Sequence, residues 1–260
     1  MVNVGTVTTA LLGVIVLLVL IFVARRSSQA FQQAKANQLL IEKLGTRDLA
    51  TLFTQFQRLR AIEFELELDR PLPPLGGFAA APDLVHALVR HIRAAVPHTV
   101  VECGSGSSTV ALARALSLNG RGHLYSLEND PDFAASTRLE LRRHGLETWA
   151  TVLDAPLGAR ETPGGMLTWY DPSGLPEGSI DLLLVDGPPV FSGELARFPA
   201  GPILFPRLAP GAMVFLDDAN RPEERRVVEL WKRDFPHLGF SEVGFEKGCV
   251  TLSVPAGRES

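Results

Sequence analysis

The stretch VVECGSGSSTVALARAL, residues 100–116, decides the fold of this chain. An apolar run typical of a β-strand leads into a turn that contains Gly104 and Gly106, and helix-forming residues follow at once. Glycine has no Cβ atom, so it permits a tight turn and lets a ligand approach the backbone. The helix beyond the turn would offer unpaired N–H groups and the positive end of its dipole to a polar ligand. The stretch therefore predicts a strand–turn–helix unit that either binds a ligand or is a plain connection.

Alternating strand and helix patterns surround this unit from about residue 80 onward. The expected strands are short and almost entirely apolar, as in DLLLVD (181–186), which is typical of strands that helices cover on both faces. We therefore predict an α/β fold, a doubly wound Rossmann-like sheet that is mostly parallel, with a C-terminal antiparallel hairpin strand in 238–254. The expected strands are 99–103, 122–127, 149–153, 180–185 and 212–217, the expected helical segments are 83–95, 108–118, 132–144, 193–208 and 222–234, and 155–178 is expected to be a loop.

The N-terminus differs from the rest, because residues 1–24 contain no charged side chain. Their apolar run is about 20 residues long, which is enough for a helix to cross the hydrocarbon core of a bilayer. A cleaved signal peptide is an alternative, but the run lacks a positive N-terminal region and a clean cleavage site. Arg25 and Arg26 follow the run, and positive charge marks the cytoplasmic side. We predict a transmembrane helix within residues 1–26, with the N-terminus outside and the remainder of the chain in the cytoplasm.

Residues 27–75 join this anchor to the predicted catalytic domain, residues 76–260. Apolar residues recur at helical spacing between Leu49 and Leu59, and the segment ends in the linker PLPPLGG (71–77). Two interpretations stay open at this point. The segment either packs as one or two helices on the domain, or forms a short coiled-coil stalk that would make the protein a homodimer.

Polar residues and glycines stand at the carboxyl end of each expected parallel strand, which is where ligands bind in such sheets. Glu128 follows the second strand, about 20 residues after the glycine turn, where a carboxylate can bind two ribose hydroxyls. A helix cap is the alternative for Glu128, although Asn129 or Asp130 is also placed to cap the next helix. Asp154 follows the third strand and is either a partner for an exocyclic amine, such as that of adenine, or a solvated turn carboxylate.

The fourth and fifth strands both end in carboxylates. Asp186 precedes a rigid Gly-Pro-Pro turn and can act as a base, a metal ligand or a partner of a cationic group. Asp217 and Asp218 are adjacent, so their side chains should point to opposite faces of the strand, and at most one should face the site. The other, or Asn220, would cap the helix that begins near Pro222.

Taken in this order and spacing, the strand ends resemble the class I S-adenosylmethionine-dependent methyltransferases over residues 80–254. The resemblance is to a bacterial group within that superfamily and, more distantly, to catechol O-methyltransferases. It implies an S-adenosylmethionine cofactor and a sheet that closes with an antiparallel strand. It rests on the segments VVECGSGSSTVALARAL, LYSLENDPDF, LDAPL, IDLLLVDGPP and GAMVFLDDANRPEE.

The resemblance also implies a role for each matching residue. The residues that would hold the cofactor are Glu102, Gly104, Ser105, Gly106 and Ser108 for its methionine part, Glu128 for the ribose, Asn129, Asp154 and Ala155 for the adenine, and Asp186 near the sulfonium; the implied catalytic residues are Asp186 and Asp218. Catechol-type enzymes hold a divalent cation with a carboxylate at the fourth strand end and an Asp-Asn pair at the fifth. Here an alanine separates the acidic pair from the asparagine, so Mg²⁺ is a weaker implication. Its implied ligands are Asp186, Asp217, Asp218 and Asn220.

We therefore expect an S-adenosylmethionine-dependent methyltransferase that methylates an oxygen of a small-molecule, glycan or lipid-linked acceptor at the cytoplasmic membrane face. One alternative is an NAD-type oxidoreductase, but Thr109 stands where the dinucleotide fingerprint has a third glycine or alanine. A membrane-tethered scaffold without activity is a second alternative. A nucleic-acid partner is not expected, since the net charge is −4.

Overall fold

The computed structural model describes residues 4–77 and 79–256 of the 260-residue chain. Side chains are described for residues 20–35, 37–38, 49–77 and 79–256. The chain divides into two compact units, Met1–Thr54 and Gln55–Ser260. The predicted boundary at the linker 71–77 therefore lies inside the second unit.

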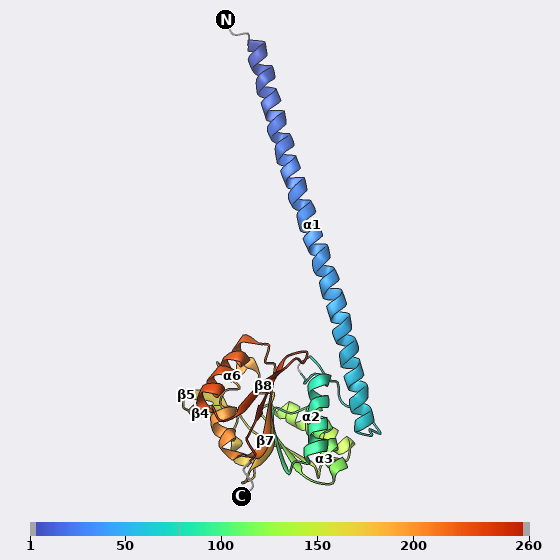
Figure 1. The fold of residues 1–260 in the computed structure, drawn as a ribbon, viewed down its shortest axis with the longest axis vertical. Coiled ribbons are helices and arrows are strands. Elements are labelled where there is room, and N and C mark those ends of the chain that lie inside the picture. The colour runs from blue at the N-terminus through green and yellow to red at the C-terminus, as the bar shows by residue number, and fades with distance from the viewer. Residues whose placement is uncertain (1–3, 78, 257–260) are drawn as a thin grey trace. The chain divides into compact units, whose positions relative to one another are not determined.

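Helix α1 (Val4–Glu65) is continuous over 62 residues and includes the start of the second unit (Figure 1). Its length follows from the sequence, because the first proline of the chain is Pro71. No helix in the described part of the chain is long and apolar enough to span a membrane. The predicted anchor, residues 1–26, falls for the most part outside the residues whose side chains are described, and it stays a prediction.

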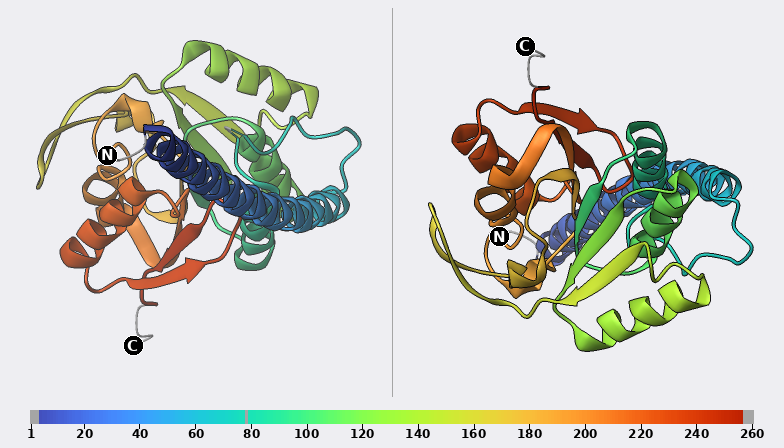
Figure 2. Two further views of the ribbon diagram at one scale, coloured as in Figure 1. Left: turned by 90° about the horizontal axis from the view of Figure 1, so that it is seen from above. Right: turned by 90° about the horizontal axis from the view of Figure 1, so that it is seen from below.

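The second unit is built on a seven-stranded sheet in the order β3-β2-β1-β6-β7-β9-β8, with helices on both faces (Figures 1 and 2). The five strands from β3 to β7 pair in parallel, as predicted. The strands are β1 (Thr99–Cys103), β2 (His123–Glu128), β3 (Ala150–Asp154), β6 (Ile180–Val185), β7 (Leu208–Asp217), β8 (Gly239–Val243) and β9 (Cys249–Ser253), and the helices are α2 (Pro82–Ala95), α3 (Ser107–Asn119), α4 (Pro131–Arg143), α5 (Ala200–Leu204) and α6 (Pro222–Asp234).

Apolar side chains on the two faces of the sheet form two separate cores. On one face, Leu182 and Leu184 pack with α2 and α3, and on the other Leu183 and Val185 pack with α5 and α6. Successive strand residues point to opposite faces, so a strand that is buried on both sides must be apolar throughout. Strand β6 meets this condition, because five of its six residues are buried and the sixth, Asp181, is half-buried.

The C-terminal hairpin is confirmed. Strand β9 runs antiparallel to both β7 and β8, and it lies between them in the sheet. The glycine of the connecting turn, Gly248, has φ +76°, a conformation that L side chains rarely adopt. One antiparallel strand on a parallel sheet is the closure that the resemblance implied.

Two segments differ from the sequence-based expectation. The expected loop 155–178 contains an antiparallel hairpin of β4 (Gly158–Thr162) and β5 (Gly165–Trp169). Its turn is formed by a Pro-Gly-Gly run in which Gly165 has φ +105°, a turn signal inside a segment that looked irregular. The expected helical stretch 193–208 shortens to α5 between short 3₁₀ turns, because it contains three prolines.

The end of α1 and the turn that follows it belong to the core of the second unit. Ile62 and Leu66 are both 0% exposed and pack with α2 and α3. Gln55 and Asp83 exchange two hydrogen bonds, Gln55 Nε2 to Asp83 Oδ2 at 2.8 Å and Asp83 N to Gln55 Oε1 at 3.0 Å. Of the two interpretations left open for this segment, packing on the domain is therefore correct for residues 55–66. The homodimer stays a prediction.

Candidate active site

The candidate site lies at the carboxyl ends of β1, β2 and β6. From β1 the chain continues to β2, which lies on one side of β1, whereas β6 pairs with β1 on its other side. The strand order therefore reverses between β1 and β6. In sheets of this kind ligands bind at this reversal, because the loops on its two sides diverge. The turn after β1 and the end of β6 are in contact there: Asp186 N donates to Cys103 O at 3.2 Å.

The glycine turn has the form that the sequence predicted. Gly104 has φ +100° and Gly106 has φ +151°, and α3 begins at the next residue. A Cβ atom at Gly106 would meet no atom within 4 Å, so the space beside this backbone is open. The first turn of α3 thus presents its N–H groups beside an open face, which suits a polar ligand.

Glu102 is almost completely buried, and its carboxylate accepts hydrogen bonds from two hydroxyl groups in the first turn of α3. Ser108 Oγ donates to Glu102 Oε1 at 2.5 Å and Thr109 Oγ1 donates to Oε2 at 2.7 Å. Burial raises the pKa of Glu102 to about 7, and these hydrogen bonds oppose the shift. Thr109 Oγ1 also accepts from Gly106 N at 2.9 Å. Thr109, which stands where the dinucleotide fingerprint has a glycine or alanine, therefore connects the glycine turn to Glu102 through two hydrogen bonds.

Glu128 is buried beside the glycine turn. Its Oε2 accepts from Ser105 Oγ at 2.7 Å and its Oε1 accepts from Asp130 N at 2.9 Å. Each carboxylate oxygen has two lone-pair sites, so each can accept one more hydrogen bond. The helix-cap alternative does not apply to Glu128, because Asp130 caps α4 by accepting from Asp132 N and Phe133 N.

The residues expected at the adenine lie next to Glu128 but differ in their surroundings. Asn129 is half-buried, and Ala155 is buried with its N–H donated to Glu128 O at 2.7 Å. Asp154 has a 70% exposed side chain and already pairs with Arg138 Nη2 at 2.8 Å. A ligand amine would have to compete with this arginine.

A cluster of carboxylates around Arg197 forms the other half of the site. Oxygen atoms of Asp186, Asp217 and Asp218 lie within 4.8 Å of one another. Arg197 is buried among them and pairs through Nη2 with Asp218 Oδ2 at 2.8 Å and Asp186 Oδ1 at 3.3 Å. Burial raises the pKa of Asp186 well above its usual range, and Arg197 opposes this shift. Burial and then Asp218 raise the pKa of Asp217, whose two side-chain oxygens have no hydrogen-bond partner among the described residues.

The expectation that Asp217 and Asp218 point to opposite sides is wrong. Strand β7 ends at Asp217, and Asp218 has φ +59°, in the left-handed region. The alternation of side chains holds only while the backbone is extended. The left-handed residue turns the chain, and both carboxylates reach the same cluster.

The metal ligands implied by the resemblance are only partly available. Asn220 is exposed and its N–H donates to Lys247 O at 3.1 Å, so its backbone is held by the β8–β9 turn. Asp186 and Asp218 already accept from Arg197, and Asp218 also pairs with Arg221 Nη1 at 2.8 Å. The three carboxylates have the spacing for a divalent cation, but two of them are occupied. The donor set does not fit a metal ion while Arg197 remains in place.

Two features of the site were missed by sequence reasoning. The first feature is Arg197. The sequence contained a signal for it, because Arg197 is the only Lys or Arg between Arg160 and Arg207. The other is the linker 71–77, which borders the site. Ser107 Oγ at the start of α3 donates to Pro74 O at 2.7 Å, and Lys247 Nζ donates to Gly77 O at 2.9 Å. No sequence pattern predicts such contacts, because each joins a side chain to a backbone carbonyl that is far away in the sequence.

Tyr170 packs beneath the turn that follows Asp186. Its side chain is buried, and a Cβ atom added to Gly187 would lie 2.2 Å from the Tyr170 hydroxyl oxygen. The same Cβ would lie 3.2 Å from Cys103 O. The backbone after Asp186 can therefore approach β1 and Tyr170 only because residue 187 is a glycine.

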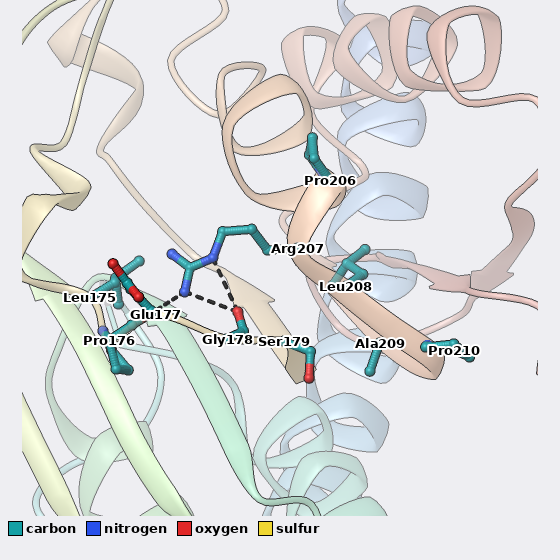
Figure 3. Close-up of a pocket in the computed structure, with 10 residues that line it drawn as sticks. All are labelled: Leu175, Pro176, Glu177, Gly178, Ser179, Pro206, Arg207, Leu208, Ala209 and Pro210. Carbon is teal, nitrogen blue, oxygen red and sulfur yellow. Dashed lines mark hydrogen bonds between the residues drawn. The ribbon is translucent and has the colours of Figure 1, made fainter.

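Two cavities in the described part of the chain lie away from these residues. One, of about 560 Å³, is lined by residues 175–179 and 206–210, at the amino ends of β6 and β7 (Figure 3). There Arg207 donates to the carbonyl oxygens of Pro176 and Gly178, which ties the two strand starts together. The second, of about 500 Å³, shares Arg207 and includes Asp171. Ligands of doubly wound sheets bind at the opposite edge, so neither cavity is the candidate site.

Residues 101–219 match the family model of a methyltransferase domain. The matched range begins in β1 and ends just after Asp218, so it contains the glycine turn, Glu128 and the Arg197 cluster. No curated protein matches the chain at a significant level.

Solved structures share the fold at low sequence identity. An O-methyltransferase from Bacillus cereus in complex with SAH has a TM-score of 0.53 and 17% identity, over 79% of this chain and 90% of that one. An SAH-bound methyltransferase from Podospora anserina has a TM-score of 0.57 and 12% identity, over 80% of this chain and 94% of that one. Each is similar in architecture to the second unit described above.

Proposed function

We propose that the protein uses S-adenosylmethionine to methylate an oxygen atom of its acceptor. Residues 101–219 match the family model of a methyltransferase domain, which supports this proposal. The observation that carries this proposal is the position of two groups at the point where the strand order reverses. Glu128 and the open glycine turn lie on one side of that point, and the carboxylate cluster at the end of β6 lies on the other.

The residues at the reversal fit the cofactor. Gly106 leaves open space beside the backbone, and the first turn of α3 offers N–H groups to the amino-acid part. Glu128 is held by Ser105 and Asp130 and keeps one accepting site on each oxygen for the two ribose hydroxyls. When bound, the cofactor supplies a methyl group carried on a positively charged sulfur. The protein has to hold the acceptor oxygen in line with that group, which is a matter of proximity and orientation.

An acceptor hydroxyl must also lose its proton, and Asp186 is placed to take it. Among the three carboxylates of the cluster, Asp186 is the most accessible, with a side chain that is 15% exposed against 6% for Asp218. A carboxylate whose pKa is raised by burial accepts a proton more readily than one in water. Asp218 accepts from two arginines, so in this arrangement it orients Arg197 and has no direct part in proton transfer.

The first test is calorimetric titration of the protein with S-adenosylhomocysteine and, separately, with NAD. We expect binding of the first only, and we expect Glu128→Ala to weaken it about 10- to 150-fold, since hydrogen bonds to a charged group contribute about 1.5–3 kcal/mol. Glu229→Ala, on the exposed face of α6, is the matched control and should bind normally. Binding of NAD, or no binding of S-adenosylhomocysteine by a protein that still unfolds cooperatively, would contradict the proposal.

We further propose that the acceptor is a small-molecule, glycan or lipid-linked compound that is met at the cytoplasmic face of a membrane. The support lies in the sequence: residues 1–24 carry no charge, and Arg25 and Arg26 follow them. An enzyme held at the membrane meets acceptors that are made there, which is why a lipid-linked acceptor is included.

Cell fractionation tests the anchor. The full chain should stay with the membrane pellet after alkaline carbonate, and a chain without residues 1–26 should move to the supernatant. Both should bind S-adenosylhomocysteine equally, because the deleted residues lie outside the second unit. Full-length protein in the supernatant, or a chain found cleaved after the apolar run, would count against the anchor.

A further inference from the structure

Arg197 lies at the centre of the polar contacts at the ends of β6 and β7. It is 4% exposed, and its guanidinium group contacts four acidic residues, three through their carboxylates and Asp217 through its backbone carbonyl. Nη1 donates to Asp217 O at 2.8 Å, while Nη2 donates to Asp218 Oδ2 at 2.8 Å and to Asp186 Oδ1 at 3.3 Å. Nε lies 3.8 Å from Glu224 Oε1. One buried cation therefore connects the ends of both strands to helix α6.

The same oxygen atoms have the spacing of a metal site. A metal ion and the Arg197 guanidinium group would therefore compete for the same carboxylates. A divalent cation bound by Asp186 and Asp218 would need oxygens at about 2.0–2.6 Å. Arg197 Nη2 already stands within hydrogen-bond distance of both carboxylates. A metal ion there would be forced against a guanidinium group that carries its own positive charge and that cannot lose its proton. Two cations cannot share this position.

We propose that Arg197 takes the place of a divalent cation, so that the carboxylates at the ends of β6 and β7 are organised by a side chain and the site binds no metal. This inference rests on the proposed function, because it assigns Arg197 to the site that methylates an oxygen. Arg197 is a positioning residue: it acts on the acceptor only through Asp186. Its planar group has several donors in fixed directions, which suits the orientation of two carboxylates at once.

The contacts also leave Asp186 free for its proposed task. Arg197 pairs with Oδ1 of Asp186, and no hydrogen bond to Oδ2 is present among the described residues. The proton that the acceptor hydroxyl loses as its oxygen gains the methyl group can pass to Oδ2. A metal ion would instead draw electron density from both oxygens of its carboxylate ligands and make Asp186 a poorer base.

Manganese binding by the full chain tests the inference, since Mn²⁺ suits oxygen ligands and is visible by electron paramagnetic resonance. The wild-type protein should bind no stoichiometric Mn²⁺, with or without S-adenosylhomocysteine, and Mn²⁺ should not raise its melting temperature. Arg197→Met removes the internal cation and keeps an unbranched side chain of moderate length. This variant should bind one equivalent of Mn²⁺ and gain several degrees of melting temperature from it.

Two further variants make the test specific. Arg197→Lys keeps a positive charge and should bind no Mn²⁺. Arg226→Met removes the same charge from an exposed pair with Glu194 and should behave like the wild type. A purely structural role for Arg197 would destabilise the methionine variant without creating a manganese site.

The outcomes are distinct. One equivalent of Mn²⁺ on the wild type that is lost in Asp186→Asn would overturn the inference, as would a folded Arg197→Met protein that binds none. If Arg197→Met does not fold, Arg197→Gln, which also removes the positive charge, takes its place in the same titration with the same expected result. Binding of S-adenosylhomocysteine is measured on the same samples, so failure of the proposed function would be seen independently of the metal result.

Discussion

A chain that begins at Gly76 should melt about 10 °C or more below one that begins at Thr51, if it folds cooperatively at all. The shorter chain loses Ile62 and Leu66, both 0% exposed in the core of the second unit. Truncation of one such residue to alanine costs about 2–5 kcal/mol, and a whole domain has only about 5–15 kcal/mol of stability. The shorter chain also lacks Gln55, which donates a hydrogen bond to the buried Asp83 carboxylate. The measurement is thermal unfolding of the two chains followed by circular dichroism.

Point variants in the full chain separate packing from the loss of a helix. Ile62→Ala and Leu66→Ala should each lower the melting temperature by several degrees. Phe64→Ala is the matched control, because Phe64 lies between these two residues in the sequence and is 85% exposed. Equal melting temperatures for the two truncated chains would show that residues 55–75 do not contribute to the core.

The sequence was sufficient for the sheet but not for the exact limits of the second unit. Short and nearly continuous apolar runs such as DLLLVD identify parallel strands that are buried on both faces, and glycine turns mark where they end. The helical spacing near Leu59 was equally visible, yet nothing local says which surface a helix covers. That the last turns of α1 belong to the domain depends on contacts with Asp83 and Arg114, which lie far away in the sequence.

In the candidate site, too, some residues follow from local sequence patterns and others depend on tertiary structure. Glu128 and Asp186 follow predicted strands, and topology alone brings strand ends to one edge of the sheet. The orientation of Asp217 and Asp218 could not be derived, because it depends on a single left-handed residue at position 218. Arg197 belongs to no strand end, and its place among the carboxylates follows from how residues 187–199 fold back. Local patterns locate the acids, and tertiary structure locates the cation that organises them.

Gly187→Ala should abolish methyl transfer or lower it by about 100-fold or more, because the new Cβ would lie 2.2 Å from the Tyr170 hydroxyl oxygen and 3.2 Å from Cys103 O. Real Cβ atoms essentially never approach other atoms to 2.2 Å. The Cys103 carbonyl belongs to the central strand β1 and cannot move far, and Tyr170 is packed against Trp169. The backbone that carries Asp186 must therefore shift away from the position that Arg197 and β1 give it.

Replacement of Tyr170 by phenylalanine removes the closer of the two obstacles, and this makes the explanation testable. Tyr170→Phe combined with Gly187→Ala should recover part of the lost activity and melting temperature, so the two changes should not be additive. Gly244→Ala is the matched control: a Cβ there meets no atom within 4 Å, and this glycine does not have a positive φ. Activity and thermal unfolding are measured for the four combinations at positions 170 and 187. Additive losses would mean that Gly187 acts through something other than contact with Tyr170, whereas recovery in the double variant would show that this contact sets the position of Asp186.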